Sequence, residues 1–204
     1  MQLFRPDSKW MEALNAFGEM MLLNLCWIIG SLPLVTIGAA STAMYAVMGQ
    51  RLRGEGSGIF AAFFHAWWRD LLPATAFWLV QILVSASLAS SFFLPLPTFF
   101  KILSGFFLVL VSLIYPLLYA QLARFRNRWF SYLKNTVILL ITKPGWALLN
   151  LLIFLAPGIF FLLFPVDFLQ YSFIWILFGF SALFYGSAVI MRRILQPLEE
   201  KAAK

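Results

Sequence analysis

The sequence predicts an all-α protein, a polytopic bundle of transmembrane helices. Of its 204 residues, 62% are hydrophobic and only 11% are charged, and a soluble domain of this length could not bury so much apolar surface in one core. Five stretches carry no charged residue and reach about the 20 residues that cross a bilayer core. They cover residues 20–50, 71–100, 102–123, 144–166 and 168–191. Their continuous apolar character lacks the alternation of a membrane β-strand.

The first uncharged stretch, residues 20–50, is interrupted by the sequence Ser31-Leu32-Pro33. As one helix it would be about 46 Å long, well beyond a hydrocarbon core of about 30 Å. Pro33 removes a backbone donor and disfavours helical geometry at Leu32, and Ser31 can satisfy a freed backbone group. We therefore expect two short helices, at about 17–32 and 36–50, joined by a turn between Ser31 and Thr36 that lies outside or at depth.

Small residues follow this break at helical spacing, and they let another backbone approach closely. They are Gly38, Thr42, Ala46 and Gly49. We interpret Pro33, Gly38 and Thr42 as structural residues of a tightly packed hairpin. The amides within the apolar stretches are expected to join helices rather than bind substrate; they are Asn24, Gln81, Gln121 and Asn150.

The basic residues predict the topology, because cytoplasmic loops are enriched in Lys and Arg. If the second short helix returns to the starting side, the chain has six crossings with both termini in the cytoplasm. Fourteen of the fifteen basic residues then lie inside, and Lys101 is the exception. A chain with an exterior N-terminus would also expose Arg5 and Lys9. We expect six crossings, or five with a re-entrant or broken N-terminal helix.

Two segments are predicted to form amphipathic helices on the cytoplasmic membrane surface. In residues 59–71 one stripe is aromatic and apolar, with His65 and Arg69 opposite it. The second segment, residues 124–144, repeats the order of basic residues, aromatic-rich helix and proline. Such helices anchor in the headgroup region or dock a protein. The candidate interaction residues are Phe63, Trp67, Arg69, Arg124 and Arg126.

One membrane domain is expected over residues 1–204, with a weak tandem repeat inside it. Arg53 and Arg124 are 71 residues apart, and so are Pro73 and Pro144. The stretches 53–123 and 124–193 would each hold an interfacial helix and two crossings. Parallel repeats occur in transporters, but similar topology also arises without transport.

No catalytic or cofactor-binding constellation is found in the sequence. The glycines of residues 54–58 are not followed by the Lys-Ser/Thr of a phosphate loop, and no metal-ligand set can be assembled around His65, the only histidine. The lone Cys26 cannot form an intrachain disulfide. The net charge of +7 is explained by cytoplasmic loops, and no groove-reading motif predicts a nucleic-acid partner. We expect a protein that is not an enzyme, needs no cofactor or metal, and has the lipid bilayer as its first partner.

Residues 22–45, LLNLCWIIGSLPLVTIGAASTAMY, closely resemble the N-terminal signature of the YesL family of bacterial membrane proteins. Residues 56–75, 122–140 and 179–195 resemble later landmarks of that family. The resemblance implies a multi-pass protein of the bacterial cell membrane, from a family of undefined function that is commonly linked to carbohydrate-uptake systems with ABC-type sugar importers. It supplies no catalytic residues.

The functional expectation is an auxiliary membrane component of such an uptake system, acting by contact with ABC sugar importer subunits. The sequence has neither a nucleotide-binding motif nor the coupling loop of importer permeases, so an ordinary permease or ATPase is not expected. The alternative is that the chain itself is a transporter or channel for a sugar or small solute. Passive passage would need no buried charge.

Overall fold

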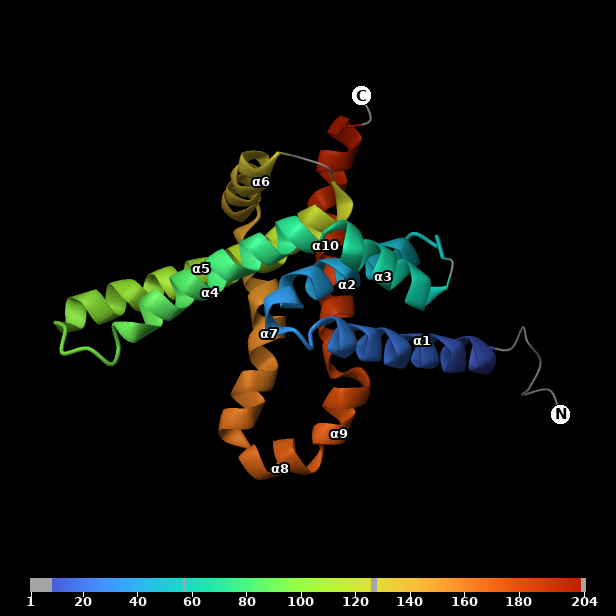
Figure 1. Ribbon diagram of the computed structural model, residues 1–204, viewed down its shortest axis with the longest axis horizontal. Helices are drawn as coiled ribbons and strands as arrows, with labels where there is room; N and C mark the ends of the chain where they lie inside the picture. The colour runs from blue at the N-terminus through green and yellow to red at the C-terminus, as the bar shows by residue number, and fades with distance from the viewer. Residues whose placement is uncertain (1–8, 57, 126–127, 203–204) are drawn as a thin grey trace.

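The computed structural model describes residues 9–56, 58–125 and 128–202, and within these ranges the chain is helical, with no strand (Figure 1). The all-α prediction is confirmed. The first half holds α1 (Lys9–Gly30), the 3₁₀ turn η1 (Leu34–Thr36), α2 (Ile37–Leu52), α3 (Ile59–Arg69), α4 (Leu71–Ser90) and α5 (Thr98–Arg124). The second half holds α6 (Trp129–Thr142), α7 (Pro144–Leu163), α8 (Pro165–Gln170), α9 (Ser172–Ile174), the π-helical turn η2 (Trp175–Gly179) and α10 (Phe180–Ala202).

Within the described residues, four helical segments are long and apolar enough to cross a membrane. They are α4, α5, α7 and the continuous segment Ser172–Leu195, which runs through α9, η2 and most of α10. The apolar part of α1, Leu14–Gly30, is shorter, and α2 has 16 residues. A helical membrane bundle is therefore confirmed. The two further crossings that the sequence predicted correspond to a pair of shorter helices, because the chain turns at Pro33.

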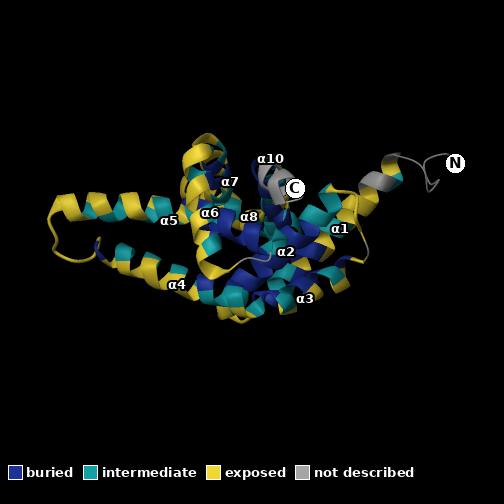
Figure 2. Cartoon of the chain, turned by 90° about the horizontal axis from the view of Figure 1, so that it is seen from above, coloured by how far each residue is buried: buried dark blue, intermediate teal, exposed yellow. Residues whose placement is uncertain are grey.

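The short helix α2 is the centre of the bundle. Every residue from Gly38 to Met48 is buried, and α2 packs against α1, α3, α4, α5 and α10. Figure 2 shows the buried residues gathered around α2, whereas the far ends of the longer helices are exposed. Those ends carry large apolar side chains, such as Leu83, Phe93 and Leu162, as expected of a lipid-facing surface.

Two long helical hairpins extend from this centre in different directions (Figure 1). One is α4–α5, and the other is α7–α10 with α8 and α9 at its tip. Helix α5 connects them, because it packs against α4 and also against α7 and α10. A short helix precedes each hairpin in the chain, α3 before α4 and α6 before α7. This order is the one expected for a tandem repeat, although the repeat itself stays a prediction.

The predicted turn between Ser31 and Thr36 is confirmed. Pro33 has a φ of −75° and a ψ of 106°, which ends helical geometry before η1. The hydroxyl of Thr36 donates to the carbonyl oxygens of Gly30 and Pro33, at 2.8 and 2.7 Å. Thr36 therefore closes the turn by satisfying carbonyl groups freed at the end of α1.

Contacts of this turn place it beside the first two turns of α4. A Cβ atom on Gly38 would lie 2.7 Å from Cβ of Trp78 and closer still to the carbonyl oxygen of Ala74. The indole N–H of Trp78 donates to the carbonyl oxygen of Leu34 at 2.8 Å. The α1–α2 hairpin thus reaches only part of the way along α4. This is the geometry of a re-entrant hairpin, the alternative that the sequence left open.

The amides of the apolar stretches join helices, as predicted. Asn24 of α1 donates to the carbonyl oxygen of Ile176 at 2.6 Å and accepts from the N–H of Ser181 at 2.8 Å. It therefore joins α1 to η2 and to the first turn of α10. Gln81 joins α4 to α5 through Tyr119, and Gln121 joins α5 to α6 through Thr136. Asn150 joins α7 to α10 and α2 through Ser187 and Tyr45.

The predicted aromatic stripe on α3 is wrong in one respect, because it covers two faces rather than one. Ile59, Phe63 and Ala66 are buried against α1 and α2, while Phe60 and Trp68 are 57% and 73% exposed. The reason is that the glycine at the end of α1 leaves room for aromatic rings. The indole N–H of Trp67 donates to the carbonyl oxygen of Gly30 at 3.1 Å. Only the second face is available to lipid or a partner.

We predict that the turn of the α1–α2 hairpin lies within the membrane. In a Cys26→Ala background, Leu32→Cys should resist an impermeant thiol reagent in both intact and permeabilised cells, because Leu32 is 72% exposed on the apolar turn. Leu96→Cys, in the α4–α5 connection, should react in intact cells, and Glu55→Cys only after permeabilisation. Reaction of Leu32→Cys in intact cells would instead establish two full crossings.

A second prediction concerns the α2–α4 crossing. Gly38→Ala should destabilise the protein by about 1–3 kcal/mol, because the added methyl overpacks against the α4 backbone. Reversible unfolding in detergent measures this change. Gly158→Ala is the matched control, since nothing lies within 4 Å of the Cβ it would add. Equal stability of the two variants would contradict the tight crossing.

Candidate anion-binding cavity

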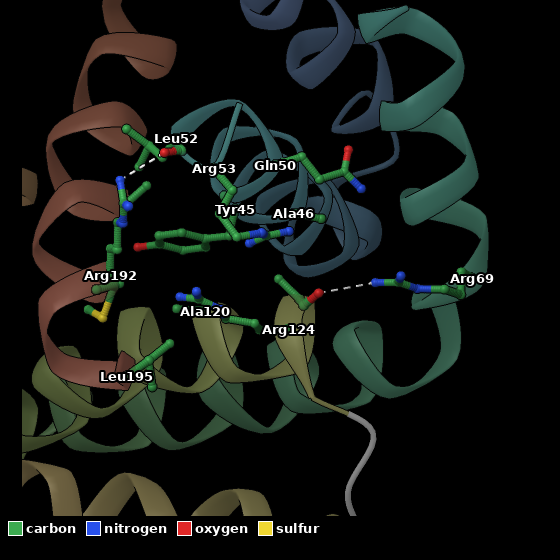
Figure 3. A pocket seen from close by; sticks show the side chains of 14 residues that line it. Tyr45, Ala46, Gln50, Leu52, Arg53, Arg69, Ala120, Arg124, Arg192 and Leu195 are labelled. Atoms are coloured by element: carbon green, nitrogen blue, oxygen red, sulfur yellow. Dashed lines mark hydrogen bonds between the residues drawn. The ribbon is translucent and has the colours of Figure 1, made fainter. Parts of the chain in front are cut away.

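A cavity of about 370 Å³ lies at the end of the bundle where α2, α3 and α5 end. Small residues leave space for it on three helices: Ala46 and Gly49 on α2, Ala120 and Ala123 on α5, and Ala188 on α10. Figure 3 shows the cavity between these helices, with the ring of Tyr45 and the amide of Gln50 at its edge. The space exists because the helices meet through residues with little or no side chain.

Four arginines line this space, and we call it the arginine cavity: Arg53, Arg69, Arg124 and Arg192. Each comes from a different part of the chain: the residue after α2, the ends of α3 and α5, and the middle of α10. Figure 3 shows Arg192 and Arg69 on opposite sides, with Arg53 and Arg124 between them. No carboxylate is among the residues that line the cavity in the described part of the chain.

Two of these arginines complete the ends of neighbouring helices. Arg192 donates from Nη1 to the carbonyl oxygen of Leu52, the last residue of α2, at 2.8 Å. Arg69 donates from Nη2 to the carbonyl oxygen of Ala123, near the end of α5, at 3.4 Å. Cations at helix C-termini are favourable because the last carbonyl groups are unpaired and carry the negative end of the helix dipole.

Two carboxylates next to the cavity offset part of its charge. Asp70 is 3% exposed and accepts a forked pair of hydrogen bonds from Arg69, with Nε at 3.1 and 3.0 Å from its two oxygens. Glu55 accepts from Arg53 at 2.9 Å in a solvent-exposed pair. That hydrogen bond holds the pKa of the Glu55 carboxyl below its usual value, and the charge of Arg124 adds to the effect. Each of these carboxylates thus pairs with one arginine of the cavity, Asp70 with Arg69 and Glu55 with Arg53.

Guanidinium groups fit planar or tetrahedral oxyanions, because each presents five N–H donors in a fixed fork. Capping and pairing use only some of these donors. The cavity can therefore bind an anion. Its lining contains neither a histidine nor a cysteine, and within the described residues no group of three His, Cys, Asp or Glu side chains could hold a metal ion.

The candidate residues from the sequence fall into three places. Arg69 and Arg124 line the cavity. Phe63 and Trp67 are on the face of α3 that packs against Gly30 of α1. Pro33, Gly38 and Thr42 belong to the hairpin; the hydroxyl of Thr42 donates to the carbonyl oxygen of Gly38 at 2.9 Å. Arg126 lies outside the described residues.

Sequence reasoning missed Arg53 and Arg192 as parts of the site. The signal was present, because both follow a predicted crossing at the side where the basic residues gather. What could not be read was that α2 and α10 pack together, which brings two arginines 139 positions apart into one cavity.

A second cavity of about 260 Å³ lies deeper in the bundle, between the two hairpins. Its walls are mostly aromatic and aliphatic, and Gln81, Ser41 and Ser112 add polar groups. Tyr45 lines both cavities. Its hydroxyl is hydrogen bonded to Ser187 at 2.5 Å, so this ring is held between them.

Residues 20–92 match the family model described as "Protein of unknown function, DUF624". The matched segment runs from the middle of α1 to the end of α4 and includes Arg53 and Arg69. No curated protein matches the chain, and no solved structure does.

The Arg69–Asp70 pair gives the third prediction. Asp70→Asn should destabilise the fold by about 1–3 kcal/mol, because a buried acceptor for Arg69 loses its charge. Glu55→Gln is the matched control and should leave thermal unfolding unchanged, since its ion pair is exposed. Equal effects of the two substitutions on the unfolding midpoint would contradict a structural role for Asp70.

Proposed function

We propose that this chain is a YesL-type protein of the bacterial cell membrane that serves as an accessory component of a carbohydrate-uptake system. It acts by contact with ABC importer subunits. The match to the DUF624 family over residues 20–92 and the resemblance of the flanking segments support the family part of this proposal. The proposed contact with importer subunits rests on exposed side chains of the two short helices α3 and α6.

The observation that carries the contact mechanism is the exposure of an aromatic side chain on each of the two short helices α3 and α6. Trp68 precedes Arg69 on α3 and is 73% exposed, and Phe130 on α6 is 86% exposed. Trp68 is the neighbour of the cavity residue Arg69 in the chain. Aromatic and arginine side chains together are the composition of binding hot spots. Helix α3 leads into α4 and α6 leads into α7, so both side chains stand beside the start of a long helix, where an importer subunit in the same membrane would meet them.

The interior of the bundle supports contact rather than transport. Asn24, Gln81, Gln121 and Asn150 each bond another helix, so these four amides hold the bundle together. Ionisable residues deep in a membrane mark ion and proton pathways. Here the charged side chains of the long helices lie near their ends, away from the middle of the bundle.

The proposed orientation has the arginine cavity in the cytoplasm. The ends of α5 and α10 and the starts of α4 and α7 lie at this side of the bundle, where Arg193 also stacks over Trp146 at 5.6 Å. The opposite connections, residues 91–97 and 164–171, contain no basic residue. Enrichment of arginine at one side is the pattern of cytoplasmic loops. Both termini are then cytoplasmic.

A transporter for a small neutral solute is the second candidate. The deeper cavity and the arginine cavity meet at Tyr45, and rotation of one ring would join them. The deeper cavity also offers aromatic faces and hydroxyl groups, which suit a sugar ring. Release of the Tyr45–Ser187 hydrogen bond would be the gating step.

Crosslinking from α3 tests the contact mechanism. A photoreactive amino acid at position 68 should capture importer subunits in cells grown on the relevant glycan, because the side chain of Trp68 is exposed on α3. The same amino acid at position 93 is the control, since Phe93 is 90% exposed at the opposite side of the bundle. Equal capture from both positions, or none from position 68, would refute the contact.

Reconstituted liposomes separate the second candidate from the first. Solute flux that Tyr45→Phe alters would favour transport, because this substitution removes the hydroxyl held by Ser187 while keeping the ring. If the flux equals that of protein-free liposomes and position 68 captures importer subunits, only the accessory role is supported.

A further inference from the structure

The deeper cavity lies at membrane depth and opens toward lipid. Its lining residues recur at helical spacing, so each surrounding helix gives it one face: positions 41 and 45 on α2, 78 and 81 on α4, 112, 115, 116 and 119 on α5, 151, 154 and 155 on α7, and 184 on α10. Most of these positions are near the middle of the segments long enough to cross a membrane. Ser112 of α5 is exposed, and Leu155 of α7 is 45% exposed. Both belong to such segments, so the rim of the cavity faces lipid.

Three polar side chains of this cavity have donors without a partner. Ser41 and Tyr115 are 7% and 9% exposed, and neither hydroxyl makes a hydrogen bond to a residue that the structure describes. Both hydroxyl oxygens remain accessible. The amide oxygen of Gln81 accepts from Tyr119 at 3.0 Å, whereas its Nε2 donates to none of the described residues. Unpaired donors away from water are costly, so the cavity suits a ligand that carries acceptors.

The aromatic walls of the cavity are fixed before any ligand binds. The polar atoms of Trp78, Tyr119 and Tyr45 are each hydrogen bonded to another helix or turn. The ring of Phe184 meets the rings of Tyr45 and Phe154 edge to face, at 5.0 and 5.4 Å. Side chains that are already ordered lose little conformational entropy on binding. A flat ring can therefore stack on these walls with little rearrangement.

We propose that the deeper cavity binds the ring of a lipid-soluble quinone. A quinone ring is flat and uncharged and carries two carbonyl oxygens, so it matches both the aromatic walls and the unpaired donors. In the described part of the chain no charged side chain lines this cavity, which suits a neutral ligand. This inference does not depend on the accessory role, and it gives the cavity a different occupant from the sugar of the second candidate.

The size and depth of the cavity favour a quinone over other membrane molecules. Its volume of about 260 Å³ is slightly below the range of cavities that enclose drug-sized ligands, about 300–1,000 Å³. It has room for one substituted ring, with the apolar tail leaving past Leu155 into lipid. An acyl chain alone would leave the donors of Ser41, Tyr115 and Gln81 unpaired. A phospholipid headgroup stays outside a hydrocarbon core of about 30 Å.

The test uses the full chain in nanodiscs of phosphatidylcholine and measures thermal unfolding with increasing decylubiquinone. We expect a saturable rise of the midpoint, because a ligand that binds only the folded state stabilises it by mass action. Decylbenzene is the matched probe, since it has a ring and the same tail but no carbonyl oxygens, and it should give no saturable rise. Glucose should also give none. No rise with decylubiquinone, an equal rise with decylbenzene, or a rise with glucose alone would overturn the proposal.

Two variants remove the unpaired hydroxyls and little else. Ser41→Ala and Tyr115→Phe should leave the midpoint of the ligand-free chain unchanged, because no hydrogen bond to a described residue is lost. Each should weaken the apparent affinity for decylubiquinone about three- to tenfold, the effect of one hydrogen bond. Tyr185→Phe is the matched control, because Tyr185 of α10 is 42% exposed and outside the cavity lining. An equal loss in Tyr185→Phe, or full affinity in both cavity variants, would contradict quinone binding at this site.

Discussion

The close crossing of α2 and α4 at Gly38 is the contact on which the other elements depend. Helices in lipid gain no hydrophobic free energy by leaving it for one another, so they associate through close packing of small residues and through hydrogen bonds. Gly38 brings the backbone of α2 against Ala74 and Trp78, and Ala39, Ala40 and Ala43 continue the small-residue surface. The short α2 can contact five helices because its side chains take so little space.

The position of α2 also explains why the arginines meet. Helix α2 ends at the same end of the bundle as α3 and α5, and its last carbonyl groups need donors there. Arg192 supplies one of them to Leu52, and Arg69 does the same for α5 at Ala123. Charged side chains are drawn to the same place by the requirements of folding. The cavity is therefore a consequence of the architecture.

The sequence was sufficient for features that depend on local chemistry and insufficient for those that depend on long-range packing. Apolar length predicted the four long helices, and Pro33 predicted the break after α1. The depth of the hairpin could not be predicted, because it follows from the contacts of Leu34 and Gly38 with α4. The stripe on α3 was assigned to lipid because periodicity cannot tell a lipid-facing surface from one covered by another membrane helix. Only half of it faces outwards.

The distribution of polar groups gives the bundle two regions with different properties. At depth, the amides of Asn24, Gln81 and Asn150 bond other helices, so moving one helix past another would leave hydrogen bonds unmade in an environment without water. This resists the large rearrangements of alternating access. At the arginine cavity, by contrast, Arg53 and Glu55 meet in a pair that solvent can replace. An ion pair that solvent reaches is broken at small cost, so another charged group is accommodated most readily at this end of the bundle.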